Sequence, residues 1–140
     1  MTRFNLGAWL VSIILLIMVT SLWAAEGWYL LVPPRSEYNE NTSYLSGYKI
    51  LDKKPLSQWG HQSAYDSASE CEAVRNSLLM VEQNVYSKSS EAYQKAIGEG
   101  ADQAALKTQR YITEKNNANV WALMASRCIR SDDPRLALTN

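Results

Sequence analysis

His61 is the only histidine in this 140-residue chain, and it is the side chain best suited to proton transfer near neutral pH. Asp66 and Glu70 follow it in the sequence and are its candidate partners. A general base needs a group that orients it, and the spacing of these residues does not place a carboxylate beside the imidazole. The sequence therefore assigns no catalytic residue. A small enzyme centred on His61 is the least favoured of the three functions considered below.

Aromatic side chains flank this histidine. Trp59, His61 and Tyr65 occupy alternate positions, and in a strand they would share one face. Exposed rings can stack on a sugar or a small apolar ligand, which makes these three the candidate ligand-facing residues. Rings also fill small cores, where each one buries a large apolar area, and we favour that interpretation.

Metal and cofactor sites are not expected. A zinc site is disfavoured because the chain has no second histidine and its thiols are expected to be oxidised. Asp132 and Asp133 precede Pro134, which is more typical of a turn than of a calcium loop. The sequence lacks the dinucleotide-binding, P-loop and nucleophile-elbow motifs.

The two cysteines, Cys71 and Cys128, are predicted to form a disulfide. An even number of cysteines in an exported domain favours a structural bond. The loop it closes would stabilise the fold by about 4 kcal/mol in the chain-entropy account. A redox role is not expected, because the sequence has no Cys-x-x-Cys motif.

Residues 6–25 carry no charge and follow Arg3, which indicates a membrane-targeting segment. Cleavage after Ala24 or Ala25 would make it a signal peptide. Its length also suits an uncleaved helix crossing a bilayer core of about 30 Å. In both cases the rest of the chain is expected outside the cytoplasm. It would be periplasmic or secreted after cleavage, or anchored to the inner membrane through residues 6–25 if the segment is not cleaved. Lys plus Arg and Asp plus Glu each number 14, so no basic surface predicts nucleic-acid binding.

The elements that would position these residues are a small sheet and two helical stretches. Ser67 and Glu70 form a capping-box pattern, which predicts a helix over residues 67–86 with Cys71 in its first turn. A second helical period covers residues 90–113. Strands are predicted at residues 28–32, 59–65 and 127–129. The expected fold is α+β, a small sheet covered by two or three helices and held by one disulfide. The alternative is a mostly helical bundle with an extended N-terminal arm.

The predicted organisation has four parts. Residues 1–25 are the signal peptide or anchor, and residues 26–56 form a strand and a polar linker. Residues 57–136 form the disulfide-stapled domain, and residues 137–140 are a tail.

Several stretches resemble a recurrent set of small exported bacterial proteins. The matching residues are 27–34, 55–59, 64–72, 127–129 and 131–136. They include Trp-Tyr-Leu-x-x-Pro-Pro from Trp28 to Pro34 and Cys-x-x-x-Asp-Asp-Pro-Arg-Leu from Cys128 to Leu136. The resemblance covers about a third of the chain and does not extend to residues 89–119. It implies an envelope location and a shared fold, and it implies no reaction.

Three functions are therefore open. The first is a non-enzymatic structural or interaction module of the bacterial envelope, with another envelope protein as its partner. The second is a binder of glycan or a small apolar ligand through the aromatic residues. The third is the small enzyme centred on His61.

Overall fold

The computed structural model describes residues 27–40 and 47–137. The predicted targeting segment at residues 1–25 and the last three residues of the predicted tail lie outside the described residues. The elements follow in the order β1 (Trp28–Val32), 3-10 helix η2 (Leu56–Gln58), β2 (Gly60–Tyr65), α2 (Ala68–Gly98), α3 (Gln103–Ala125), β3 (Arg127–Arg130) and 3-10 helix η3 (Pro134–Leu136).

The three strands form one antiparallel sheet in the order β2-β1-β3. The central strand β1 contributes Leu30 and Leu31, whose side chains point to opposite faces and are both fully buried. An uninterrupted apolar run is typical of a strand that is covered on both faces. The α+β prediction and the three predicted strands are confirmed, with bounds that differ by at most one residue.

One face of the sheet packs against the two 3-10 helices. Leu31 and Ile129 from the sheet join Leu56 and Trp59 in a buried cluster. The indole Nε1 of Trp59 donates to the carbonyl of Lys54 at 2.9 Å, so the polar end of the ring is also satisfied. This cluster forms a small core on the side of the sheet away from α2.

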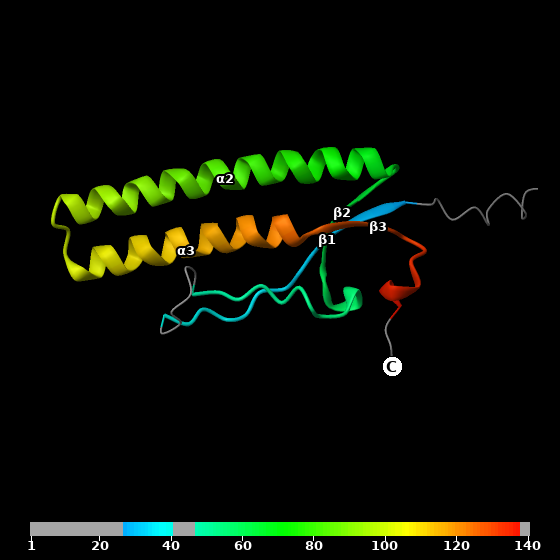
Figure 1. The fold of residues 1–140 in the computed structure, drawn as a ribbon, viewed down its shortest axis with the longest axis horizontal. Helices are drawn as coiled ribbons and strands as arrows, with labels where there is room; N and C mark the ends of the chain where they lie inside the picture. Colours follow the sequence, from blue (N-terminus) through cyan, green and yellow to red (C-terminus); the bar gives the residue numbers. More distant parts are fainter. Residues whose placement is uncertain (1–26, 41–46, 138–140) are drawn as a thin grey trace, which may run out of the picture.

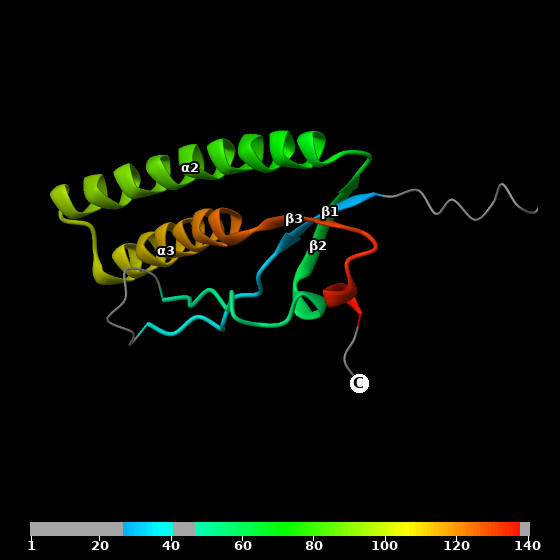
Figure 2. The same cartoon turned by 45° about the vertical axis from the view of Figure 1, so that its right-hand side comes forward.

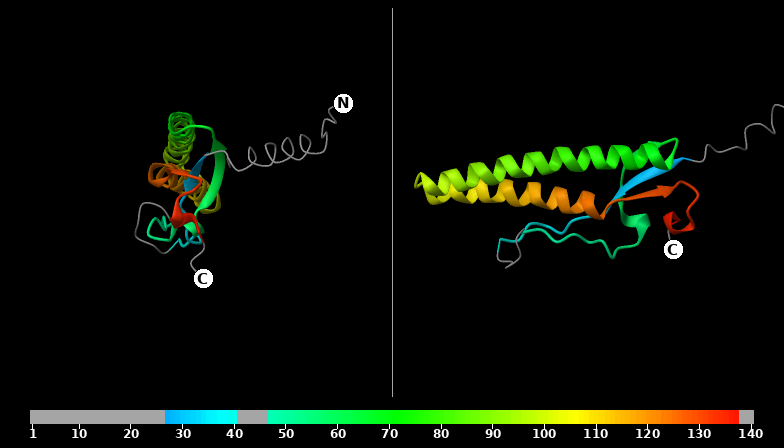
Figure 3. Two further views of the ribbon diagram at one scale, coloured as in Figure 1. Left: turned by 90° about the vertical axis from the view of Figure 1, so that its right-hand side faces the viewer. Right: turned by 45° about the horizontal axis from the view of Figure 1, so that its top comes forward.

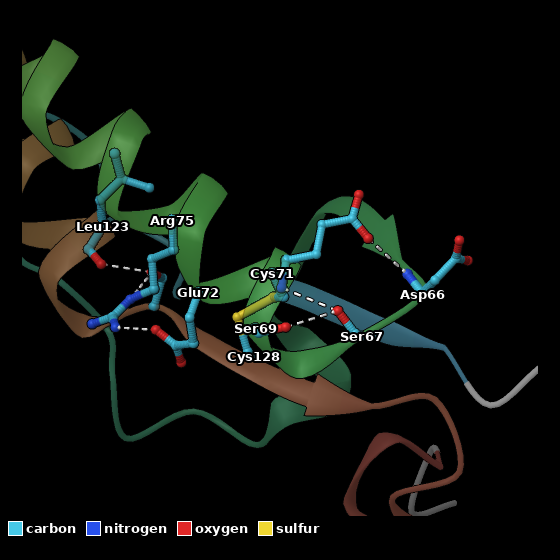
Figure 4. The surroundings of a disulfide bond; sticks show 10 residues. Asp66, Ser67, Ser69, Cys71, Glu72, Arg75, Leu123 and Cys128 are labelled. Carbon is cyan, nitrogen blue, oxygen red and sulfur yellow. Dashed lines mark hydrogen bonds and ion pairs between the residues drawn. A yellow bond between two sulfur atoms is a disulfide. The ribbon is translucent and has the colours of Figure 1, made fainter.

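The first turns of α2 cover the other face of the sheet, and the disulfide fastens them there (Figure 4). Cys71 is fully buried and bonds to Cys128 of β3, which confirms the predicted disulfide. The Ser67 hydroxyl accepts from the Glu70 backbone N–H at 3.2 Å, as the capping-box pattern predicts. The Glu70 carboxylate reaches back to the N–H of Asp66 rather than to that of Ser67. The capped first turn is therefore held by local hydrogen bonds and by the disulfide.

Helices α2 and α3 lie side by side and antiparallel, and they extend well beyond the sheet (Figures 1 and 2). The connection between them uses Gly100 at a φ of 68°, a value that glycine adopts without strain. Asp102 then caps α3 by accepting from the Ala105 N–H at 2.8 Å. Near the sheet, the Arg75 guanidinium binds Ser126 and the Met124 carbonyl at the end of α3, where a cation suits the helix dipole.

The helix bounds differ from those predicted. The helix predicted to end at residue 86 continues to Gly98, and the second begins at Gln103 rather than near residue 90. Ser89 does not end α2, since packing against α3 continues there and the Thr113 hydroxyl donates to the Ser89 carbonyl at 3.0 Å. Tertiary contact therefore outweighs the weak helix propensity of serine.

Between Val32 and Leu56, the described residues of the predicted polar linker form no regular strand or helix, yet they pack along α3. We call residues 33–40 and 47–55 the arm; it doubles back on itself and runs beside α3 (Figure 3). Its two limbs are joined by backbone hydrogen bonds from Ser36 to Lys49 and from Asn39 to Gly47, at 2.9 and 2.8 Å. Within the residues that the structure describes, no helix is both long and apolar enough to cross a bilayer.

A cluster of polar and aromatic side chains fastens the arm to α3. Glu114 is 8% exposed, and its carboxylate accepts from the Gly47 N–H at 3.3 Å and from Arg110 Nε at 2.8 Å. The ring of Tyr38 lies edge-on to that of Tyr111, with centroids 5.0 Å apart. Burial and the Glu114 carboxylate raise the pKa of Tyr38 above its ordinary value. We call this set the arm clasp.

Candidate functional site

A cavity of about 750 Å³ lies where β2, the arm and both long helices meet. It is a groove that is open to solvent over much of its extent rather than an enclosed cavity. We call it the junction groove. Its lining residues are Val32, Pro33, Pro34, Arg35, Ser36, Tyr48, Gln58, Gly60, His61, Gln62, Leu78, Glu82, Asn119, Ala122 and Leu123.

Three consecutive residues of β2 line the groove, and a β-bulge shapes them. Leu30 pairs with Ser63 and Leu31 with His61, so Gln62 is an extra residue between two paired positions. Because paired residues share a face, His61 lies on the face of Leu31, and its ring contacts that of Tyr29 with centroids 4.9 Å apart. The bulge therefore determines which β2 side chains face which layer.

The three aromatic candidates are not brought together. Trp59 is 4% exposed and belongs to the core, so its ring is not available to stack on a ligand in this fold. The reason is that η2 turns the chain before β2 begins, which directs the indole toward Leu31 and Ile129. Tyr65 pairs with Trp28 beyond the bulge, on the opposite face from His61, and does not line the groove. Of the three candidates, only His61 is exposed in the groove.

A polar chain of hydrogen bonds crosses the groove lining. The Asn119 amide on α3 accepts from Arg35 of the arm through Oδ1 and donates to Glu82 of α2 at 3.0 Å through Nδ2. The guanidinium of Arg35 also lies 5.7 Å from the ring centre of Tyr48. These contacts connect the arm, α3 and α2. The positive charge of Arg35 and the negative charge of Glu82 are both hydrogen-bonded to the same amide, that of Asn119.

Several other polar side chains in the groove are available for a ligand. The imidazole of His61 and the side-chain amides of Gln58 and Gln62 make no hydrogen bond to any residue within 27–40 and 47–137. These side chains supply hydrogen-bond donors and acceptors to a lining that also contains the apolar side chains of Leu78 and Leu123. A few polar groups around apolar walls are typical of binding sites.

The predicted acid–base partners of His61 are engaged elsewhere. Asp66 lies five residues further along an extended strand, roughly 16 Å away at about 3.3 Å per residue. Glu70 is hydrogen-bonded at the start of α2. No hydrogen bond joins either carboxylate to the imidazole, whereas a positioned acid–base pair requires contact directly or through one water.

The other acidic candidates have structural roles. Asp133 caps η3 and bonds to Arg135 at 2.7 Å, and this partner holds the pKa of Asp133 at about 2. Asp132 pairs with Arg130 at 2.9 Å. No cluster of three or more His, Cys, Asp or Glu residues suited to a metal ion occurs among the described residues.

Sequence reasoning missed most of the groove. Arg35 and Asn119 are 84 positions apart, and Glu82 lies on a third element, so no local spacing links them. The cluster Asn116-Asn117-Ala118-Asn119 has a composition typical of turns and helix caps, whereas the structure places it inside α3. The one local indication was the run of polar side chains around Gln62, which predicts that this part of β2 is exposed to solvent.

Comparison with protein-family models, with curated proteins and with solved structures finds no match to this chain.

Proposed function

We propose that this chain is a non-enzymatic interaction module of the bacterial envelope, which binds a partner protein in the junction groove. The observation that carries the proposal is the groove itself, with its open polar side chains beside apolar walls. The arm, the sheet and both long helices contribute to it, so its shape depends on the whole fold.

Two features support an extracytoplasmic location. The uncharged segment at residues 6–25 follows Arg3, as in signal peptides and anchors. The disulfide between Cys71 and Cys128 suits an oxidising compartment. The groove would then face partners outside the cytoplasm, whether the segment is cleaved or retained.

Placement outside the cytoplasm can be tested by the intact mass of the protein isolated from its own cells without reductant. A mass that begins near residue 26 would indicate a released domain, and a full-length mass in the membrane fraction would indicate an anchor. A full-length chain in the cytosolic fraction with both thiols reduced would contradict the proposal.

Binding in the groove can be tested by placing a photo-crosslinking amino acid at Gln62 in living cells. Gln94, exposed on α2 and outside the groove, provides the matched control position. We expect one discrete crosslinked product from position 62 and none from position 94. Equal labelling from both positions, or none from position 62, would remove the evidence for a groove partner.

The enzymatic alternative has its own test. A turnover that is reproducible with the purified protein and lost in His61→Ala would replace the proposed function with a catalytic one. Retained folding of that variant, checked by its thermal transition, is the necessary control.

A further inference from the structure

The outer edge of β2 is open. Its neighbour in the sheet is β1 alone, and within the described part of the chain its backbone pairs with no other segment. The residues from Gly60 to Ala64 are all exposed. An edge strand presents backbone N–H and C=O groups that can pair with another chain.

The two edges of the sheet differ in how they are protected. The other edge strand, β3, carries Arg127 and Arg130 and is held by the disulfide at Cys128. Charged side chains are a common protection against unwanted strand pairing. The β2 sequence, Gly-His-Gln-Ser-Ala-Tyr, contains no Lys, Arg, Asp, Glu or Pro. The bulge at Gln62 interrupts the regular pattern of the β2 edge, but β2 has no charged side chain, so it is the less protected of the two edges.

The open edge is continuous with the junction groove. Gly60, His61 and Gln62 belong to both, and Leu78 and Leu123 supply apolar walls beside them. A strand added along β2 would direct alternate side chains to one face, where they would reach the groove. Recognition by strand addition combines backbone hydrogen bonds with pockets for alternate side chains in this way.

The charges of the site indicate what kind of segment it accepts. Arg35 and Glu82 are the charged residues of the groove lining, and both are bonded to the amide of Asn119. Their charges compensate each other, so an uncharged segment is complementary to the site and a strongly charged one is not. The β2 strand is itself uncharged, so the edge is also complementary to an uncharged segment.

We propose that β2 is a docking edge for an uncharged, extended segment of a partner protein, which pairs with it as a fourth strand and places alternate side chains in the junction groove. This rests on the proposed function and specifies the chemistry of its partner. A second copy of the chain is the rival occupant that the test must distinguish.

The test uses the protein purified from its own cells and a displayed library of random nine-residue peptides that contain no Asp, Glu, Lys or Arg. A selected binder is then synthesised in three forms: unmodified, N-methylated at two odd positions, and N-methylated at two even positions. Only alternate residues of an added antiparallel strand direct their N–H groups at β2. Because the bulge at Gln62 shifts this alternation by one residue, the two methylated positions of each series are two residues apart and lie in the same half of the peptide. One methylated series should therefore bind about thirtyfold more weakly than the unmodified peptide, and the other should bind like it.

Hydrogen exchange provides an independent measurement. The unmodified peptide should slow amide exchange within Gly60–Tyr65 and leave that of β3, the other edge, unchanged. Protection of β2 that grows with protein concentration in the absence of peptide would instead identify a second copy as the occupant and overturn the proposal.

The possible failures are distinguishable. If a groove crosslink forms at Gln62 but the library yields no binder, or both methylated series bind alike, the interaction module stands and strand addition falls. If no crosslink forms and no peptide binds, both proposals fall.

Discussion

Gly47 shows how a single residue can hold the arm in place. A Cβ atom at this position would stand 2.7 Å from Cδ2 of the Tyr38 ring and closer still to its neighbour Cε2. Tyr38 in turn packs on Tyr111 of α3, so the ring has little room to retreat. The arm clasp therefore depends on the absence of a side chain at Gly47.

We predict that Gly47→Ala lowers the free energy of unfolding by about 1–3 kcal/mol, because the added methyl group displaces the Tyr38 ring. Gly98→Ala is the control. Nothing lies within 4 Å of a Cβ atom there, and alanine favours the helix, so stability should be unchanged or higher by up to about 1 kcal/mol. Urea unfolding of both variants provides the measurement, and equal effects would contradict the clasp.

Tyr48 lies beside the arm clasp, where its hydroxyl donates to that of Tyr111 at 3.4 Å, and it predicts a loss of stability in alkali. Burial and the hydrogen bond to Tyr111 raise the pKa of Tyr48 to about 12. A raised pKa favours the neutral phenol in the folded state, so this stabilisation is present below pH 10 and is lost as the pH rises toward about 12. The free energy of unfolding should fall over this range in the native protein and fall less in Tyr48→Phe. Parallel curves for the two proteins would show that Tyr48 is not responsible.

At the scale of elements, α2 illustrates both the success and the limit of pattern reading. Apolar residues recur along α2 at steps of three and four and form a stripe, which begins at the fully buried Cys71 and continues to Val81 and Val85. Val81 and Val85 are 56% and 42% exposed. The sequence makes α2 amphipathic along this stripe. The helix extends beyond the sheet, however, and the sheet buries only the first turns of the helix. The sequence pattern predicted the start of this helix but not its length, and burial of its side chains followed from where the other elements end.

The cap of α2 is a local feature whose effect can be predicted. Ser67→Ala removes the hydroxyl that accepts from the Glu70 N–H, and we expect a loss of about 1 kcal/mol in the free energy of unfolding. Ser77→Ala, at an exposed position in the middle of the same helix, should change stability by less than about 0.5 kcal/mol. Chemical denaturation of the two variants gives the comparison. A loss at Ser77 as large as that at Ser67 would exclude capping as the cause.

For the whole molecule, the disulfide joins the start of α2 to the last strand across a sequence separation of 57 residues. We predict that the double variant Cys71→Ala, Cys128→Ala loses about 4 kcal/mol, because its unfolded chain is no longer constrained by that loop. Native protein measured in reductant should lose a similar amount. Reduction that leaves the midpoint of denaturation unchanged would show that packing alone holds the two elements together.

The sequence by itself determined the strands, the capped start of α2, the disulfide pairing and the absence of familiar catalytic motifs. The strands, the helix cap and the motifs depend on residues that are neighbours in the sequence. The disulfide pairing follows because the chain has two cysteines. Only the tertiary structure decided the length of the helical hairpin, the burial of Trp59 and the groove shared by His61, Glu82 and Asn119. The physical reason is that these depend on contacts between segments far apart in the chain, including a one-residue bulge at Gln62 that places His61 and Tyr65 on opposite faces.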